Sequence, residues 1–86
     1  RWAIPGARAE QVEERYFLQG TLARIVRDVP RGDQGTLRYT LDGREYELPA
    51  RDVDGDTIPS GTDVVIDRVE DGVAYVELWA RVEQRL

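Results

Sequence analysis

An Asp42-Gly43 pair lies between two runs of alternating apolar and polar residues, and no other feature constrains the fold as much. A type I′ turn requires positive φ at both central positions, and Asp-Gly is among the residue pairs that accept this conformation. The pair therefore predicts a two-residue β-hairpin over residues 35–50, with one largely apolar and one polar face. The predicted register pairs Leu41 with Arg44, Tyr39 with Tyr46 and Leu37 with Leu48 on the apolar face, and Thr40 with Glu45 and Arg38 with Glu47 on the polar face.

Three further segments have the composition of strands. Residues 17–29 predict a long first strand that bends near residues 23–26, because its apolar residues change from even to odd positions and back. Residues 62–69 and 73–80 predict the fourth and fifth strands, which follow a polar loop over residues 51–61. Between them we expect a three-residue loop, Glu70-Asp71-Gly72, with Gly72 in the left-handed position. That loop sets Ile66 against Val76 and Val64 against Leu78.

The order of these strands predicts an all-β fold, a five-stranded OB-like Greek-key barrel in which the long, bent first strand serves both sheets. With 86 residues, the chain has room for one domain of this kind. We expect an irregular or partly helical lead-in over residues 1–16, the OB-fold domain over residues 17–80 and a C-terminal tail over residues 81–86.

The expected register leaves a second apolar face on the hairpin of the fourth and fifth strands, where a barrel normally presents polar residues to water. Either residues 1–16 or the tail over residues 80–86 cover this face, or it binds a partner protein, since contiguous exposed apolar area commonly marks an interaction site. The candidate partner-binding residues are Val65, Val69, Val73, Tyr75 and Trp79.

The chain offers little material for catalysis or for metal binding. It has neither histidine nor cysteine, so its one serine, Ser60, lacks an activating base and zinc lacks its nitrogen and sulfur ligands. The run from Asp52 to Asp56, with Asp63 at the twelfth place, imitates an EF-hand loop, but Thr57 stands where that loop requires glycine. We therefore expect a solvated acidic loop, and we predict no enzyme activity, no catalytic residue, no metal and no cofactor.

Charge argues against nucleic acid as a partner. The net charge is −5, and the arginines are scattered among acidic residues, whereas phosphate binding requires a concentrated cationic face. Five-stranded barrels do bind oligonucleotides on stacking aromatics, and Tyr39 and Tyr46 are the candidates here. We expect both tyrosines in the core, and Glu45 and Glu47 on the outer face would repel phosphate.

Residues 19–79 resemble the C-terminal OB-fold domain of the NfeD family. The resemblance rests on the order of several short elements rather than on any one of them. These elements are Gly20, the Pro30-Arg31-Gly32 loop, Gly35-Thr36-Leu37, the segment from Gly43-Arg44-Glu45 to Pro49-Ala50, the strand marked by Ile58, Gly61-Thr62, Val64 and Ile66, and the closing hairpin that ends in Tyr75-Val76-Glu77.

The resemblance implies a non-catalytic protein-interaction domain of a short membrane protein, with a flotillin- or stomatin-type scaffold in membrane microdomains as its partner. Some longer members add a serine protease domain, which this chain does not contain. Because the chain opens with Arg1-Trp2, we expect a fragment whose missing upstream part anchors it to the membrane, with this domain on the cytoplasmic side. The alternative is an OB-fold domain that binds a ligand or single-stranded nucleic acid.

Overall fold

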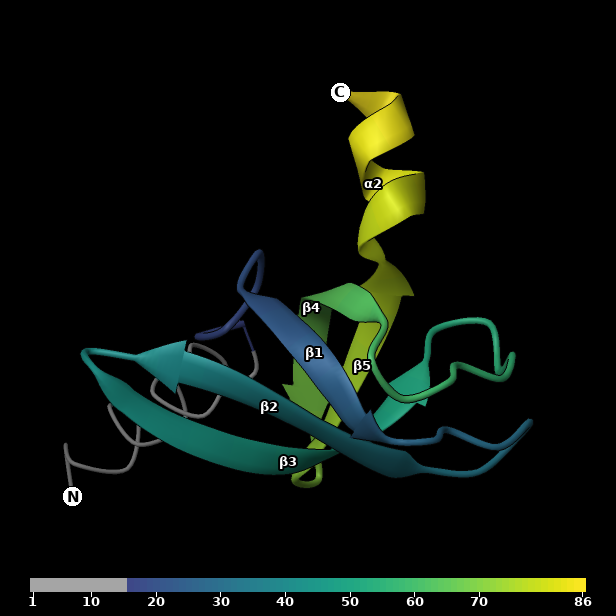
Figure 1. The fold of residues 1–86 in the computed structure, drawn as a ribbon, viewed down its shortest axis with the longest axis horizontal. Coiled ribbons are helices and arrows are strands. Elements are labelled where there is room, and N and C mark those ends of the chain that lie inside the picture. Colours follow the sequence, from purple (N-terminus) through teal and green to yellow (C-terminus); the bar gives the residue numbers. More distant parts are fainter. Residues whose placement is uncertain (1–15) are drawn as a thin grey trace, which may run out of the picture.

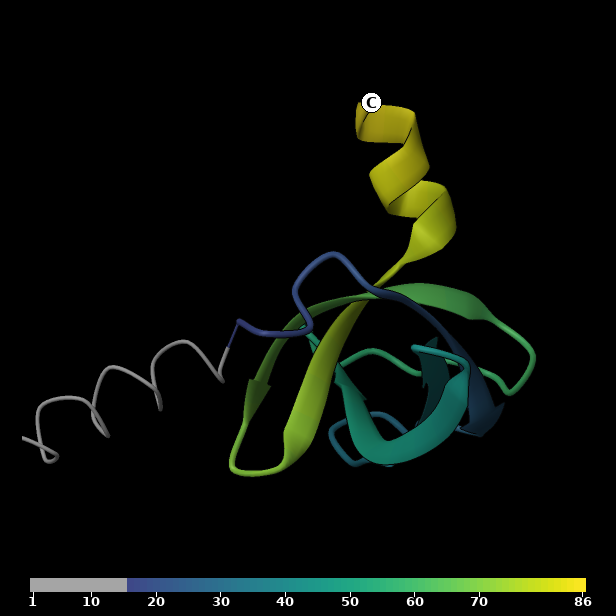
Figure 2. The same cartoon turned by 90° about the vertical axis from the view of Figure 1, so that its left-hand side faces the viewer.

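The computed structural model describes residues 16–86, and its strands close into a single barrel (Figures 1 and 2). The elements are β1 (Leu22–Arg27), β2 (Gly35–Leu41), β3 (Arg44–Asp52), β4 (Asp63–Glu70), β5 (Val73–Leu78) and the helix α2 (Trp79–Arg85). Around the barrel the strands follow the order β1-β2-β3-β5-β4, in which only β3 and β5 run parallel. The predicted all-β, five-stranded OB-like barrel is confirmed.

The β2–β3 hairpin has the predicted turn and the predicted register. Asp42 and Gly43 both have positive φ, 53° and 78°, as a type I′ turn requires. Leu41 lies opposite Arg44, and every further pair expected between the two strands is present. Turn chemistry and the alternation of faces are both local properties, and here they agree.

The β4–β5 hairpin has the predicted register, but its turn differs from the predicted one. Ile66 lies opposite Val76 as expected, but Glu70 pairs with Val73, so the turn has two residues rather than three. Asp71 has φ 52° and Gly72 has φ 77°, which is again a type I′ turn. The extra residue is absorbed by a β-bulge between Ile66 and Arg68. The predicted three-residue loop is therefore wrong, although the pairing that motivated it is correct.

The predicted ends of the first and last strands also need correction. Strand β1 covers Leu22–Arg27 only, and residues 16–19 form a turn in which the Gln19 N–H donates to the Tyr16 carbonyl. The register irregularity near Ile25 confirms the predicted bend. Strand β5 stops at Leu78, and Trp79 begins a helix that occupies most of the expected C-terminal tail. The predicted lead-in lies, except for its last residue, outside the described residues.

The core is formed by inward-facing residues from all five strands and from the loop between β3 and β4. That loop was expected to be polar, yet Ile58 is fully buried and pairs with Val29 in an isolated antiparallel bridge. The largest fully buried side chains are Ile25, Leu37, Ile58, Ile66, Val29, Val64 and Val76. Among residues 16–86, Asp52 is the one buried charged residue.

Candidate interaction surface

The outer face of the β4–β5 hairpin carries three of the five residues predicted to bind a partner. Val65, Val73 and Tyr75 are half-buried there, and each lies opposite a charged residue of the neighbouring strand. The cross-strand partners are Glu77 for Val65, Glu70 for Val73 and Arg68 for Tyr75. This face is therefore a mixture of apolar and charged side chains, whereas the sequence predicted an apolar one.

The structure separates the other two candidates from this face. Val69 lies opposite Ala74 and packs against the core, because the bulge at residue 67 shifts the alternation of faces along β4. Trp79 is the first residue of α2 and not part of β5. A bulge of one residue is enough to move Val69 from one side of the sheet to the other.

An arginine covers the aromatic ring on this face. The Arg68 guanidinium carbon lies 4.5 Å from the centroid of the Tyr75 ring, which is a cation–π contact. Arg68 also forms ion pairs with Asp67 at 2.8 Å and with Glu70 at 3.5 Å. The hydrogen bond to Asp67, followed by the charge of Glu70, raises the pKa of Arg68 above its ordinary value. Arg68 thus covers one face of the Tyr75 ring.

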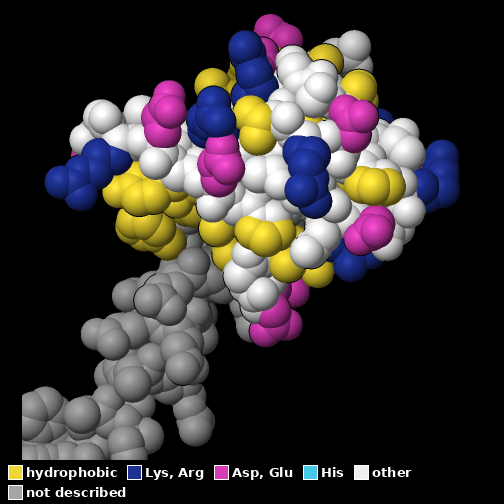
Figure 3. Space-filling model, turned by 60° about the horizontal axis from the view of Figure 1, so that its bottom comes forward, with side chains coloured by type: hydrophobic (Ala, Val, Ile, Leu, Met, Phe, Trp, Pro, Cys, Tyr) yellow, Lys and Arg dark blue, Asp and Glu magenta, His cyan; other side chains and the backbone are white. Residues whose placement is uncertain are grey.

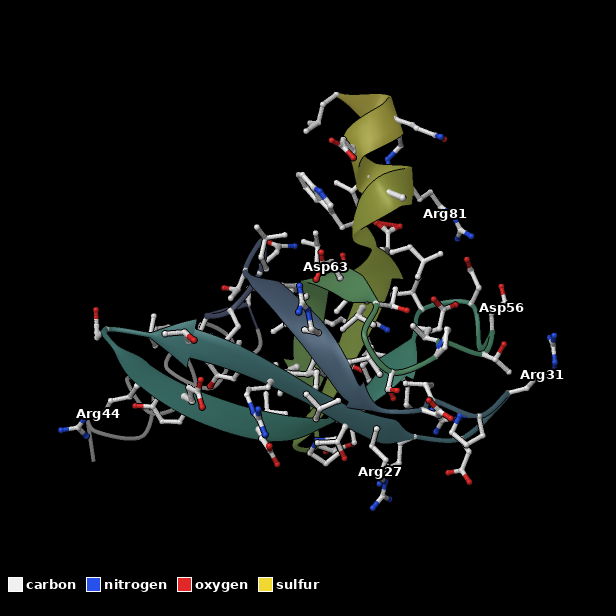
Figure 4. All side chains as sticks on the ribbon, in the orientation of Figure 1. Arg27, Arg31, Arg44, Asp56, Asp63 and Arg81 are labelled. Atoms are coloured by element: carbon white, nitrogen blue, oxygen red, sulfur yellow. The ribbon has the colours of Figure 1, made fainter. Side chains whose placement is uncertain are left out.

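Trp79 instead lines a groove of about 390 Å³ between α2 and the first part of β1. Leu22, Tyr39 and Trp79 supply its apolar walls. Two arginines border it: Arg24, which donates to Asp63 at 3.0 Å, and Arg38, which is bonded to Glu47. We call this feature the Trp79 groove; in Figure 4 the labelled Asp63 lies where β4 begins, below α2.

Leu22 joins the groove to the outer face of β4. It pairs directly with Val65, so the two side chains share one face, and Leu22 is 57% exposed. Sequence reasoning missed Leu22 because the bend in the first strand left its faces unassigned. The only available signal was its alternation with Ala23 and Ile25, both of which are buried. Leu22 therefore lies both on the face that carries Val65 and at the groove that Trp79 lines.

Helix α2 does not cover this surface. It projects from the barrel, and none of its residues is buried (Figures 1 and 2). Trp79, Val82 and Leu86 follow a helical spacing on one side, and Leu86 is 91% exposed. Arg81 of α2 lies 3.6 Å from Asp54, and Arg85 donates to Glu77 at 2.7 Å, a contact that raises the pKa of Arg85.

The acidic loop that imitates an EF-hand uses its first carboxylate to hold its own backbone. One oxygen of Asp52 accepts from the backbone N–H of Asp54 at 2.8 Å and of Asp56 at 3.2 Å. Asp54 and Asp56 each lie within an ion pair, and Figure 4 shows Asp56 beside Arg31. Within residues 16–86, no group of three or more histidine, cysteine or acidic side chains is placed to hold a metal ion.

The two tyrosines that were weighed as a nucleic-acid platform do stack on each other. The ring centroids of Tyr39 and Tyr46 are 5.3 Å apart, with an angle of 22° between the ring planes. They share the predicted face, but Tyr46 is 40% exposed, because the β2–β3 hairpin extends past the rest of the barrel. The expectation that both belong to the core is therefore wrong for Tyr46. On the opposite face Arg38 and Glu47 form a 2.6 Å ion pair, which raises the pKa of Arg38.

No protein-family model matches the chain, and no curated protein sequence matches it. Three solved structures have the same fold. The soluble domain of the NfeD protein YuaF from Bacillus subtilis superposes with a TM-score of 0.68 and 23% identity, over 92% of this chain and 96% of that one. The C-terminal domain of the stomatin operon partner protein 1510-C from Pyrococcus horikoshii has a TM-score of 0.60 and 16% identity, over 74% and 91%.

The third neighbour is the soluble domain of a membrane protein implicated in regulation of membrane protease activity, from Corynebacterium glutamicum. It has a TM-score of 0.59 and 27% identity, over 72% of this chain and 92% of that one. Across residues 16–86, the only helix is far too short to span a bilayer. The neighbours confirm the resemblance that the sequence predicted: this chain has the OB-like barrel fold of NfeD-type soluble domains.

Proposed function

We propose that this chain is the non-catalytic protein-interaction domain of an NfeD-like membrane protein, and that it binds a flotillin- or stomatin-type scaffold protein. One structural neighbour is the C-terminal domain of a stomatin operon partner protein, which supports this class of scaffold. In this proposal residues 17–80 form the interaction domain, residues 1–16 connect it to a preceding membrane segment, and residues 81–86 form its C-terminal extension.

The observation that carries the proposal is the exposure of Leu22 beside the Trp79 groove. A leucine that is 57% exposed, next to a half-buried tryptophan, offers an apolar anchor and a concave place for a partner side chain. Val65, Val73 and Tyr75 extend the proposed contact along the outer face of the β4–β5 hairpin. Val69, which packs against the core, supports this face from below.

The test is a binding titration between the purified domain and the purified scaffold protein of the same organism. Leu22→Ser and Trp79→Ser should each weaken binding by about tenfold or more, because each removes a large apolar anchor. Val26→Ser is the matched control, since Val26 is another exposed apolar residue of β1 that does not line the groove. Circular dichroism establishes that all three variants remain folded.

Unchanged affinity in both groove variants would refute the proposed contact surface. Absence of binding by the unaltered domain, to either class of scaffold, would refute the proposed function itself.

Membrane attachment and orientation form a separate part of the proposal. Two of the neighbours are described as soluble domains, one of an NfeD protein and one of a membrane protein, which supports attachment of this domain to a membrane segment. We propose that the domain lies on the cytoplasmic side. A fluorescent protein fused after Leu86 of the full-length protein should then fluoresce, and an alkaline phosphatase fusion at the same place should be inactive. The reverse result would place the domain on the other side.

A further inference from the structure

The outer half of β3 has a neighbouring strand on one side only. Strand β2 pairs with β3 from Arg44 to Ala50, but β5 pairs with it only from Ala50 to Asp52. Within the described part of the chain, residues 44–48 have no backbone partner on the β5 side. In Figure 1, β3 continues well past the turn that joins β4 to β5. The barrel is closed, yet the hairpin extends from it as a ribbon, and this edge of β3 has no partner strand among residues 16–86.

The register of the hairpin identifies which backbone groups are unpaired. In a two-residue hairpin the residues that flank the turn, Leu41 and Arg44, are hydrogen-bonded to each other, and the pattern alternates from there. The N–H and C=O groups of Tyr46 therefore point towards β2, and those of Glu45 and Glu47 point away from it. Pro49 ends the row because proline has no N–H to donate.

The side chains along this edge differ between its two faces. Glu45 and Glu47 lie on one face, and Tyr46 lies on the other, stacked on Tyr39. Arg38 pairs with Glu47 through contacts of 2.6 and 3.1 Å that remain about half exposed to water, and Glu45 forms no ion pair with any described residue. Figure 3 shows a cluster of hydrophobic side chains at the left-hand end of the molecule, which is the end that the β2–β3 hairpin forms in Figure 1. The edge is thus acidic on one face and aromatic on the other.

We propose that an extended segment of a partner protein adds to β3 as a strand opposite residues 45–47. Side chains of a strand alternate between faces, so the segment would carry basic residues facing Glu45 and Glu47, with an apolar residue between them against Tyr46. The backbone groups of Glu45 and Glu47 supply hydrogen bonds, and the acidic face that these two side chains form favours a basic strand. The groove is lined by β2 residues that pair with this part of β3, but the outward backbone groups of Glu45 and Glu47 point away from β2, so the proposal goes beyond scaffold binding at the groove.

A second copy of the chain fits this edge poorly. Two-fold pairing of β3 about Tyr46 would set Glu45 opposite Glu47 of the other copy twice, and like charges directly opposite each other destabilise a sheet. The same two acidic residues that select a basic segment therefore protect the edge from self-association.

The experiment uses a blocked five-residue peptide that alternates lysine and valine, with a glutamate–valine peptide of equal length as the comparison. Nuclear magnetic resonance follows the amide signals and their hydrogen exchange. The Glu45 and Glu47 amides should gain protection when the lysine peptide binds, and this peptide should bind about tenfold more tightly than the glutamate peptide, because its charges complement those of the edge. Equal binding of both peptides, or protection elsewhere, overturns the proposal.

Two variants separate charge from backbone. Glu45→Lys should reverse the preference between the peptides, whereas Glu83→Lys, the same change of charge on α2, should leave it unaltered. Glu45→Pro removes an outward N–H without touching the bonds to β2, but it also removes the carboxylate, so it is compared with Glu45→Gln, which removes the charge alone. The proline variant should bind the lysine peptide about tenfold more weakly than the glutamine variant, because about one hydrogen bond is lost. An unaltered preference in Glu45→Lys overturns the proposal.

Two further outcomes test which molecule occupies the edge and whether β3 is the binding site. Protection of the two amides that rises with protein concentration in the absence of peptide would identify a second copy as the occupant and overturn the basic segment. Loss of peptide binding in Trp79→Ser would overturn the assignment to β3, whereas its retention supports an edge that is independent of the groove.

Discussion

At the scale of single residues, Gly35 and Asp52 act through the backbone around them. Gly35 opens β2 where the chain passes the end of β1, and a Cβ placed on it would overlap the carbonyl oxygens of Arg27 and Asp28. Asp52 places a buried carboxylate beneath the next loop and accepts two backbone N–H groups. In both cases the neighbours that matter are backbone atoms, which cannot move aside as side chains do.

Gly35→Ala should destabilise the barrel by about 3 kcal/mol, the upper end of the usual range for forcing extra volume into a packed site, because the overlapping atoms belong to the backbone. Gly20→Ala is the comparison: nothing lies within 4 Å of a Cβ at that position, so only the positive φ of 86° opposes the change. That conformation should cost about 1 kcal/mol. Urea unfolding measures both variants, and equal losses would contradict the role assigned to close packing at Gly35.

Asp52→Ala should cost about 1–3 kcal/mol, because it leaves two loop N–H groups without their acceptor. Asp52→Asn should cost less, since a single oxygen accepts both hydrogen bonds and an amide oxygen in its place can still do so, without the negative charge. The thermal midpoint of the unaltered protein should not change on addition of calcium, because the Asp52 carboxylate is occupied by the loop backbone. A midpoint that rises with calcium, and fails to rise in Asp52→Asn, would show that the loop is a cation site.

At the scale of elements, the two hairpins differ in how far local sequence determines them. In the β2–β3 hairpin the turn and the register follow from the same two residues. In the β4–β5 hairpin the apolar pairs define the register. Two arrangements are compatible with that register: a three-residue loop, or a two-residue turn combined with a bulge in β4. The bulge between Ile66 and Arg68 is the observed solution, and bulges increase the local twist that a small barrel needs in order to close.

Asp71→Val distinguishes the two loops experimentally. In the observed turn Asp71 has φ 52°, a conformation in which a β-branched residue is strained, so the variant should lose about 1–3 kcal/mol. Asp71→Asn, which tolerates positive φ, should cost little. In the three-residue loop residue 71 would have negative φ, and valine would then be accepted. Equal stability of the two variants would therefore contradict the type I′ turn.

At the scale of the whole molecule, closure depends on pairings between distant segments. Strand β3 meets β5 through three parallel pairs, and β1 meets β4 through three antiparallel pairs. Helix α2 lies outside this closed structure and buries no residue of its own. The barrel and the helix therefore contribute very differently to stability, although they are adjacent in sequence.

Removal of residues 79–86 should lower the melting temperature by no more than about 8 °C, the shift that corresponds to a small loss of stability in a domain of this size. The truncated barrel should keep its near-ultraviolet tyrosine signal and lose affinity for the scaffold, because Trp79 is removed. Ile66→Ala is the contrast, since deleting a fully buried side chain from the core costs about 2–5 kcal/mol. Unfolding of the truncated chain would mean that α2 is part of the core structure.

The net charge of the whole chain predicts no measurable affinity for nucleic acid. With a net charge of −5, and with the stacked tyrosines adjacent to Glu45 and Glu47, the domain should not bind a single-stranded oligonucleotide at a submillimolar concentration even in low salt. Fluorescence anisotropy of a labelled oligonucleotide tests this expectation. Submillimolar binding that weakens as salt is added would favour the alternative OB-fold function.

The sequence by itself determined the strand order, the type I′ turn at Asp42-Gly43 and the pairing of both hairpins. These depend on conformational preferences of one or two residues and on the period of two in a strand, both of which are local. Only the tertiary structure decided that β5 ends at Leu78, that a bulge at residue 67 places Val69 on the core, and that Leu22 is exposed beside Trp79. Those outcomes depend on how distant strands meet when the barrel closes, and several local arrangements of similar energy are resolved only by that packing.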